Sequence, residues 1–187
     1  MEAFLVSTGV VALAEIGDKT QLLSLFLAAR FRRPLPLGLG ILAATLVNHG
    51  LTAWLGVAAG DLVPVSAQRW IVAIAFFAVA IWALVPDKMS EDSAPRAARS
   101  NASAFMAAMV SFFIVEIGDK TQVATLMLAA KFNSIFAVGL GTTLGMMLAN
   151  VPALLFGDRL LARLPLKWIR IGAALTFAAL GLIALFY

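Results

Sequence analysis

The sequence predicts an all-α integral membrane protein in which six transmembrane helices form two inverted three-helix repeats. Three observations predict this fold class: an apolar composition, six long apolar runs, and a polar motif that occurs twice. Of the 187 residues, 62% are hydrophobic and 13% are charged, whereas soluble domains have roughly 45–50% apolar and about 25% charged residues. Because a small soluble protein cannot cover so large an apolar surplus, the composition excludes soluble enzymes, disordered tails and disulfide scaffolds.

Each apolar run is long enough to cross a hydrocarbon core of about 30 Å, which takes about 20 helical residues. The runs cover approximately residues 4–29, 35–58, 69–85, 104–130, 135–157 and 166–187. A polar stretch from Asp87 to Ser103 separates the third run from the fourth. We therefore expect a first three-helix repeat over residues 1–86, a cytoplasmic linker over 87–103, and a second, inverted three-helix repeat over 104–187.

The basic residues predict how the chain is oriented in the membrane. Ten of the fourteen Lys and Arg residues lie in the joints between runs one and two, three and four, and five and six. The opposite side, with both termini, has only Arg69 and Lys131. Since Lys and Arg collect in cytoplasmic loops, both termini are expected on the non-cytoplasmic side. The net charge of +4 then serves to orient loops in the bilayer, and we expect no nucleic-acid partner.

Residues 15–40 and 116–141 are copies of each other. They match at 15 of 26 positions, and the match includes the seven-residue segment Glu-Ile-Gly-Asp-Lys-Thr-Gln, which begins at Glu15 and at Glu116. Shared Leu and Ala arise easily between membrane helices, but a shared charged motif does not. Because each copy has three spans, an odd number, the second copy is expected upside down relative to the first. Inverted repeats are typical of secondary transporters whose substrate site lies near the midplane.

Four acidic residues, Glu15, Asp18, Glu116 and Asp119, fall inside the apolar runs. A charged side chain at the bilayer centre costs at least about 2.5–3.5 kcal/mol, so such residues are by default functional. Glu and Asp three residues apart share one face of a continuous helix, and inverted symmetry would bring all four carboxylates around one point. Oxygen ligands in this number suit Ca²⁺, Mn²⁺ or Mg²⁺, which predicts a divalent-cation site.

Lys19 and Lys120 follow the glutamates at i+4, a spacing that supports ion pairs. The four carboxylates and two ammonium groups have a net charge of −2, which one divalent cation or two protons would neutralise. Carboxylates that are crowded together away from water bind protons more readily, so exchange of metal for protons is expected. The alternative interpretation is that Glu15–Lys19 and Glu116–Lys120 are structural ion pairs that only connect the helices.

Further polar residues are candidates for a supporting role or a proton path. Thr20, Thr121, Gln21 and Gln122 reach the acids only if the helix breaks near Gly17 or Gly118, a residue type that loosens helices. Other candidates lie on polar faces of the second and fifth runs, where interhelical hydrogen bonds are the alternative interpretation. The full set of supporting candidates is Lys19, Lys120, Gln21, Gln122, Asn48, His49, Asn150, Thr20 and Thr121.

Two copies of E-x-G-D-K-[T/S] in a six-span chain with a polar middle loop resemble the Gdt-type family of cation/proton exchangers. That family includes bacterial manganese exporters of the MneA type and eukaryotic Golgi Ca²⁺/Mn²⁺ transporters. The resemblance implies Mn²⁺ or Ca²⁺ as transported substrate, no cofactor, no enzymatic activity, and a bacterial inner-membrane location. It also implies that Glu15, Asp18, Glu116 and Asp119 bind the metal and exchange protons.

The function expected from the sequence is export of Mn²⁺, and of Ca²⁺ as an open second substrate, from the cytoplasm in exchange for protons. One alternative is a six-span exporter of cationic amino acids, whose ammonium group the acids would hold. Another is an intramembrane aspartyl protease, disfavoured because Glu15 and Glu116 replace the first glycine of its Gly-x-Gly-Asp motif. A non-conducting scaffold is disfavoured by the cost of the buried acids. The sequence leaves a homodimer open.

Overall fold

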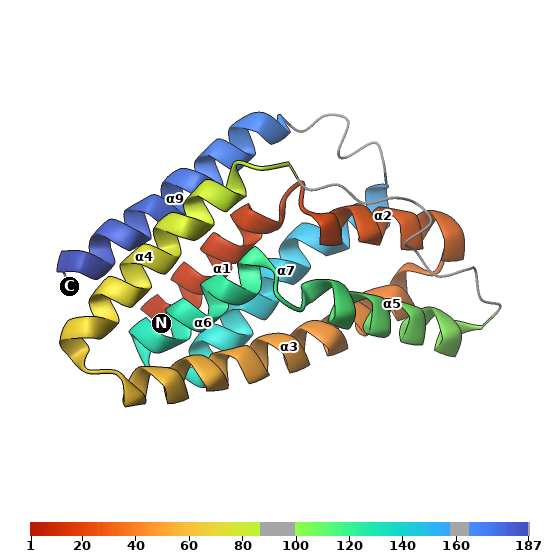
Figure 1. Cartoon of the computed structure of the whole chain (residues 1–187). Coiled ribbons are helices and arrows are strands. Elements are labelled where there is room, and N and C mark those ends of the chain that lie inside the picture. Colours follow the sequence, from red (N-terminus) through yellow and green to blue (C-terminus); the bar gives the residue numbers. More distant parts are fainter. Residues whose placement is uncertain (87–99, 158–164, 187) are drawn as a thin grey trace.

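A computed structural model describes residues 1–86, 100–157 and 165–186, and these residues form helices with no strand among them (Figure 1). The helices are α1 (Glu2–Glu15), α2 (Lys19–Phe31), α3 (Pro34–Leu62), α4 (Val65–Ala83), α5 (Asn101–Glu116), α6 (Lys120–Phe132), α7 (Ile135–Phe156) and α9 (Leu166–Phe186). Most of the expected linker over 87–103, namely 87–99, lies outside the described residues. The same holds for 158–164 in the joint between the fifth and sixth runs.

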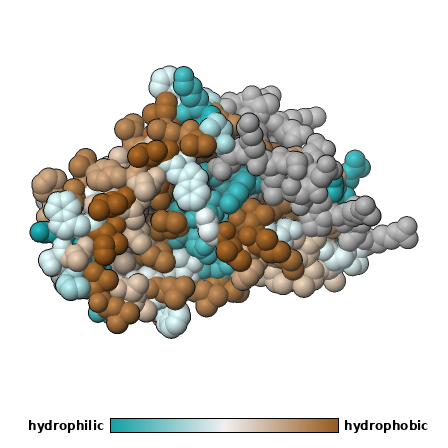
Figure 2. Space-filling view, in the orientation of Figure 1, coloured by the Kyte–Doolittle hydropathy of each residue, from teal (hydrophilic) through white to brown (hydrophobic). Residues whose placement is uncertain are grey.

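Four helices, α3, α4, α7 and α9, are long and apolar enough to span a membrane, and α5 with α6 counts as a fifth span if the bent pair is taken as one. Apolar side chains cover much of the visible face in Figure 2. Leu39, Ile74 and Leu175 are among the large hydrophobic residues exposed on this surface. So much exposed apolar surface is expected of a protein whose solvent is the bilayer. The all-helical membrane fold is therefore confirmed at this level.

The first and fourth apolar runs are not continuous helices. Each is interrupted at the repeated motif: α1 ends at Glu15 and α2 begins at Lys19, while α5 ends at Glu116 and α6 begins at Lys120. The axes of α5 and α6 differ in direction by 72°. Gly17 and Gly118 have φ values of +81° and +77°, a left-handed conformation that glycine adopts without steric cost. The helix break that the two glycines allowed is therefore present in both runs.

The two halves of the chain break into helices at equivalent positions. The bounds of α2 and α6 differ by the repeat offset of 101 residues, as do the starts of α3 and α7 and of α4 and α9. In Figure 1, α1 and α2 run away from the end that carries both termini, whereas α5 and α6 run back toward it. The broken segments of the two halves thus approach each other near the middle of the molecule.

The halves interlock through close helix packing. α1 packs against α7 and α3 packs against α5, while α4 and α9 pack side by side. A Cβ atom added to Gly40 would lie 2.4 Å from the carbonyl oxygen of Phe105, and one added to Gly141 would lie 2.6 Å from that of Phe4. Small residues permit this close approach of helix backbones in membranes. The packing fixes α1 and α5, and with them the two motif breaks.

Candidate cation site at two helix breaks

Three buried carboxylates meet where the broken helices approach each other. Glu15 ends α1, Asp18 is the N-cap residue of α2, and Asp119 is the N-cap residue of α6. One oxygen from each of the three lies within 4.8 Å of the others. None of the three is more than 1% exposed. Since Ca²⁺ holds oxygen ligands at about 2.3–2.6 Å, a single hard cation could contact all three.

The helix break also explains why aspartates stand at this point. Asp18 and Asp119 have extended backbone and directly precede α2 and α6. The N-terminus of a helix carries a partial positive charge, which favours a carboxylate there. Glu15 and Asp18 therefore converge because the chain turns between them. The expectation that they share a face of one continuous helix was wrong, although they do come together.

The two lysines form ion pairs that cross from one half of the chain to the other. Lys19 Nζ lies 3.1 Å from Asp119 Oδ1, and Lys120 pairs with Asp18. This differs from the expected i+4 pairs of Lys19 with Glu15 and of Lys120 with Glu116. Because the chain breaks between each glutamate and its lysine, the i+4 geometry of a helix does not apply here.

Glu116 lies beside the group of three rather than in it. Its Oε2 atom is 3.5 Å from Nε2 of His49, and both side chains are fully buried. The position equivalent to His49 in the second half is Asn150, so the surroundings of the two glutamates differ.

Both motif threonines contact an acid. Thr20 Oγ1 donates a hydrogen bond to Glu15 Oε2, and Thr121 Oγ1 donates to Asp119 Oδ2 at 3.3 Å. On a continuous helix these hydroxyl groups would point away from the carboxylates. The break at the glycine therefore brings them to the site, as the sequence allowed.

The motif glutamines hold the two breaks in shape. Gln21 Oε1 accepts a hydrogen bond from the Gly17 N–H at 2.8 Å, and Gln122 Oε1 accepts one from the Gly118 N–H at 2.7 Å. Gln21 also donates from Nε2 to the carbonyl oxygen of Ala149 at 2.9 Å. These bonds make both glutamines part of the turn that presents the aspartates.

The asparagines on α3 and α7 bind backbone and side-chain groups near the breaks. Asn48 Nδ2 donates to the carbonyl oxygen of Phe113 at 3.2 Å. Asn150 Nδ2 donates to the Met146 carbonyl at 3.1 Å, and its Oδ1 accepts from Ser24 Oγ at 2.7 Å. Ser24 is not among the residues predicted from the sequence. The sequence feature that could have identified it is the hydroxyl group that Ser24 shares with its repeat equivalent, Thr125.

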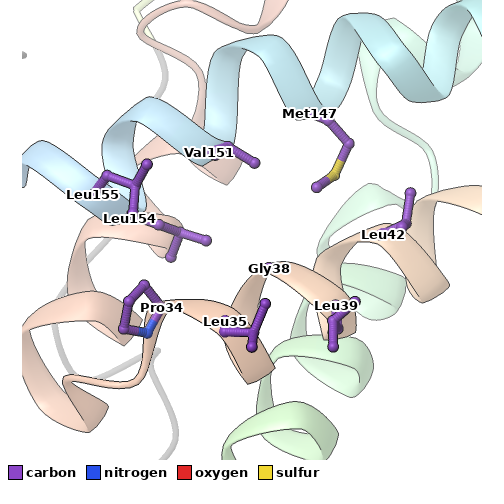
Figure 3. Close-up of a pocket in the computed structure, with 9 residues that line it drawn as sticks. All are labelled: Pro34, Leu35, Gly38, Leu39, Leu42, Met147, Val151, Leu154 and Leu155. Atoms are coloured by element: carbon purple, nitrogen blue, oxygen red, sulfur yellow. The ribbon is translucent and has the colours of Figure 1, made fainter.

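A pocket of about 340 Å³ lies between α3 and α7, away from the acids (Figure 3). It has only apolar lining residues: Pro34, Leu35, Gly38, Leu39, Leu42, Met147, Val151, Leu154 and Leu155. None of these side chains offers an oxygen ligand to a hard cation. The buried carboxylates at the helix breaks therefore remain the candidate site.

Apolar helices that enclose a group of buried carboxylates are typical of a membrane protein that binds or transports cations. The family model described as "Divalent cation/proton antiporter GDT1" matches residues 3–91 and 104–187, and the chain therefore belongs to the GDT1 family of divalent cation/proton antiporters. The match covers both motif breaks and nearly all of the helices among the described residues. The resemblance seen in the repeated motif is confirmed.

Curated relatives match over nearly the full chain. A Vibrio cholerae protein named "Putative manganese exporter" is 44% identical over 188 residues, which cover 100% of this chain and 92% of the relative. GDT1-like protein 5 of Arabidopsis thaliana is 26% identical, with 97% of this chain and 94% of the relative covered. GDT1-like protein 5 of Oryza sativa is 27% identical, with 97% and 93% covered. No solved structure matches the chain.

Proposed function

We propose that this antiporter exports Mn²⁺ from the cytoplasm in exchange for protons, through a midplane site formed by Glu15, Asp18, Glu116 and Asp119. One observation carries the proposal: three fully buried carboxylates lie within 4.8 Å of one another where two broken helices meet. Acidic residues buried within a membrane are costly, and they mark ion pathways and binding sites. Glu116 completes the set when the helices close around the ion.

The proposed architecture is six spans in two inverted repeats, with α1–α2 and α5–α6 each counted as one broken span. The opposite directions of these two pairs in Figure 1 support it. So does Phe76, whose ring stacks on that of its repeat equivalent Phe177 at a centroid distance of 6.3 Å. A residue that packs against its own equivalent lies close to a two-fold axis. We place the repeats at 1–86 and 104–187, joined by a cytoplasmic linker over 87–103, with both termini on the outer side of the inner membrane.

The proposed mechanism is alternating access with one site shared by two kinds of ligand. The deprotonated carboxylates take up the metal from the cytoplasm, and protons from the other side displace it as the half-bundles rock. Thr20 and Thr121 orient two of the acids through their hydroxyl groups. His49, 3.5 Å from Glu116, is proposed to serve the proton path.

Two features support Mn²⁺ as the substrate. The chain has no cysteine and one histidine, so its carboxylates suit hard cations rather than Zn²⁺ or Cu⁺. The Vibrio relative carries the name of a manganese exporter. Ca²⁺ takes the same oxygen ligands and is proposed as a second substrate.

The test is ion-driven proton movement in proteoliposomes, with Mn²⁺, Ca²⁺, Mg²⁺ and lysine compared at equal concentration. We expect Mn²⁺ to drive proton movement, and the Glu15→Gln and Glu116→Gln variants to lose nearly all of the rate because each removes a carboxylate from the proposed site. Glu2→Gln, at the exposed start of α1, is the matched control and should keep the wild-type rate. Metal flux without proton movement would exclude antiport, and a response to lysine alone would favour a cationic amino-acid exporter.

A further inference from the structure

We infer that Lys19 and Lys120 act as built-in cations, which neutralise the aspartates of the empty site and must be displaced by the divalent ion. Lys19 is the first to leave. The inference rests on the proposed function and adds a role for the lysines as competitors of the substrate. They set the affinity of the site without ligating the metal.

Each ion pair joins a lysine of one half of the chain to an aspartate of the other half. Lys19, at the start of α2, reaches Asp119 in the second half at 3.1 Å, and Lys120, at the start of α6, reaches Asp18 in the first. Both aspartates are 1% exposed. Buried carboxylates this close would repel each other strongly without a counter-charge. The lysines therefore stabilise the empty site.

The same aspartates belong to the group of three that suits a cation. An ammonium group 3.1 Å from Asp119 Oδ1 occupies the space on that oxygen where a metal would bind. A divalent ion at about 2.3–2.6 Å from the oxygens would also repel an ammonium group a few ångströms away, and the repulsion is stronger where water is excluded. The metal and the lysines therefore exclude each other, and both lysines keep their protons when displaced.

The exposure of the two lysines sets the order of displacement. The Lys19 side chain is 25% exposed, whereas that of Lys120 is 4% exposed. Because the Lys19 side chain reaches the molecular surface, its ammonium group can leave Asp119 with less rearrangement of the helices than Lys120 needs. Lys120 can leave Asp18 only if the packing around it opens. Release of Lys19 therefore admits the ion, and release of Lys120 accompanies the conformational change.

The first test measures Mn²⁺ binding to the purified protein from the spin-resonance signal of free Mn²⁺. We expect Lys19→Gln to bind Mn²⁺ at least about tenfold more tightly, or ~1.4 kcal/mol, and Lys19→Arg, which keeps the charge, to bind as wild type does. Lys131→Gln removes one positive charge from the last turn of α6 and should have no effect. Unchanged or weaker binding by Lys19→Gln, with wild-type thermal unfolding, would overturn the inference.

The second test uses the wild-type chain. Mass spectrometry measures labelling of each lysine by an amine-reactive reagent, with and without saturating MnCl₂. Release from Asp119 should raise labelling of Lys19 several-fold, while Lys131 stays constant as the internal reference. Constant or lower labelling of Lys19 would overturn the inference. If the wild-type protein binds neither Mn²⁺ nor Ca²⁺, the proposed function itself fails; if it binds and the lysines do not respond, only this inference fails.

Discussion

The side chain of Gln21 accepts a hydrogen bond from the backbone N–H of Gly17 at 2.8 Å, and so holds the turn between α1 and α2. Gln122 holds Gly118 in the same way at 2.7 Å. Each turn directly precedes the aspartate that caps the next helix. The last residue of the repeated motif thus fixes the geometry of the acids at its centre.

Replacing the motif glutamines should therefore destabilise the protein to different extents. Gln21→Ala removes two hydrogen bonds, to Gly17 and to Ala149, whereas Gln122→Ala removes the one to Gly118. At about 1 kcal/mol for each bond, the expected losses of stability are about 2 and about 1 kcal/mol. Thermal unfolding in detergent measures them. Gln68→Ala, which loses a bond to Ala130 far from the motif, should lower stability without weakening Mn²⁺ binding.

The left-handed backbone at Gly118 predicts that alanine at this position destabilises the protein. A Cβ atom added there meets nothing within 4 Å, so only the φ of +77° opposes substitution. Gly118→Ala should cost about 1–2 kcal/mol of stability and should reduce transport, because the turn presents Asp119. Gly172 also has nothing within 4 Å and has no positive φ. Equal unfolding temperatures for Gly118→Ala and Gly172→Ala would contradict the account of the break.

Close helix packing predicts a third effect. Gly141→Ala would place a Cβ atom 2.6 Å from the carbonyl oxygen of Phe4, and this contact can relax only if α1 and α7 move apart. We expect a loss of about 1–3 kcal/mol, as for other overpacked sites, measured by thermal unfolding. Gly9→Ala, in α1 with nothing within 4 Å, is the control and should be neutral or slightly stabilising.

The hydrogen bond from the Thr20 hydroxyl group predicts that its removal weakens Mn²⁺ binding. It donates to Glu15 Oε2, and loss of such an outer-shell partner typically costs 10–100-fold in metal affinity. Thr20→Val should weaken Mn²⁺ binding by about that factor, while Thr20→Ser should restore it. Thr176→Val, which loses a bond to the Gly172 carbonyl on α9, should bind Mn²⁺ normally. Wild-type affinity in Thr20→Val would remove Thr20 from the site.

Much of the candidate site could be predicted because its charged residues lie within apolar segments. Acids inside apolar runs are expensive, and the charged motif occurs twice, so Glu15, Asp18 and Asp119 were identifiable before their positions were known. The glycine between the acids indicated where a helix loosens. The helix boundaries of the second half then follow those of the first.

The partners of the charges could not be predicted, because helical spacing describes only an unbroken helix. The i+4 rule assigns Lys19 to Glu15, but the break turns Lys19 toward Asp119. That contact joins residues 100 positions apart, and only the packing of α1 on α7 and of α3 on α5 brings them together. Glu116 likewise lies close to His49 because α3 packs against α5. The hydrophobic periodicity of the sequence does not predict which helices pack together.

Antiport through one site requires that the same buried carboxylates hold either a divalent cation or protons. Proton release on metal binding tests this requirement: MnCl₂ is added to the purified protein in weakly buffered solution, and the pH is followed with an indicator dye. We expect proton release that saturates together with Mn²⁺ binding, because the glutamates give up protons to bind the ion, and clearly less release in Glu116→Gln. Saturable Mn²⁺ binding with no proton release would contradict it.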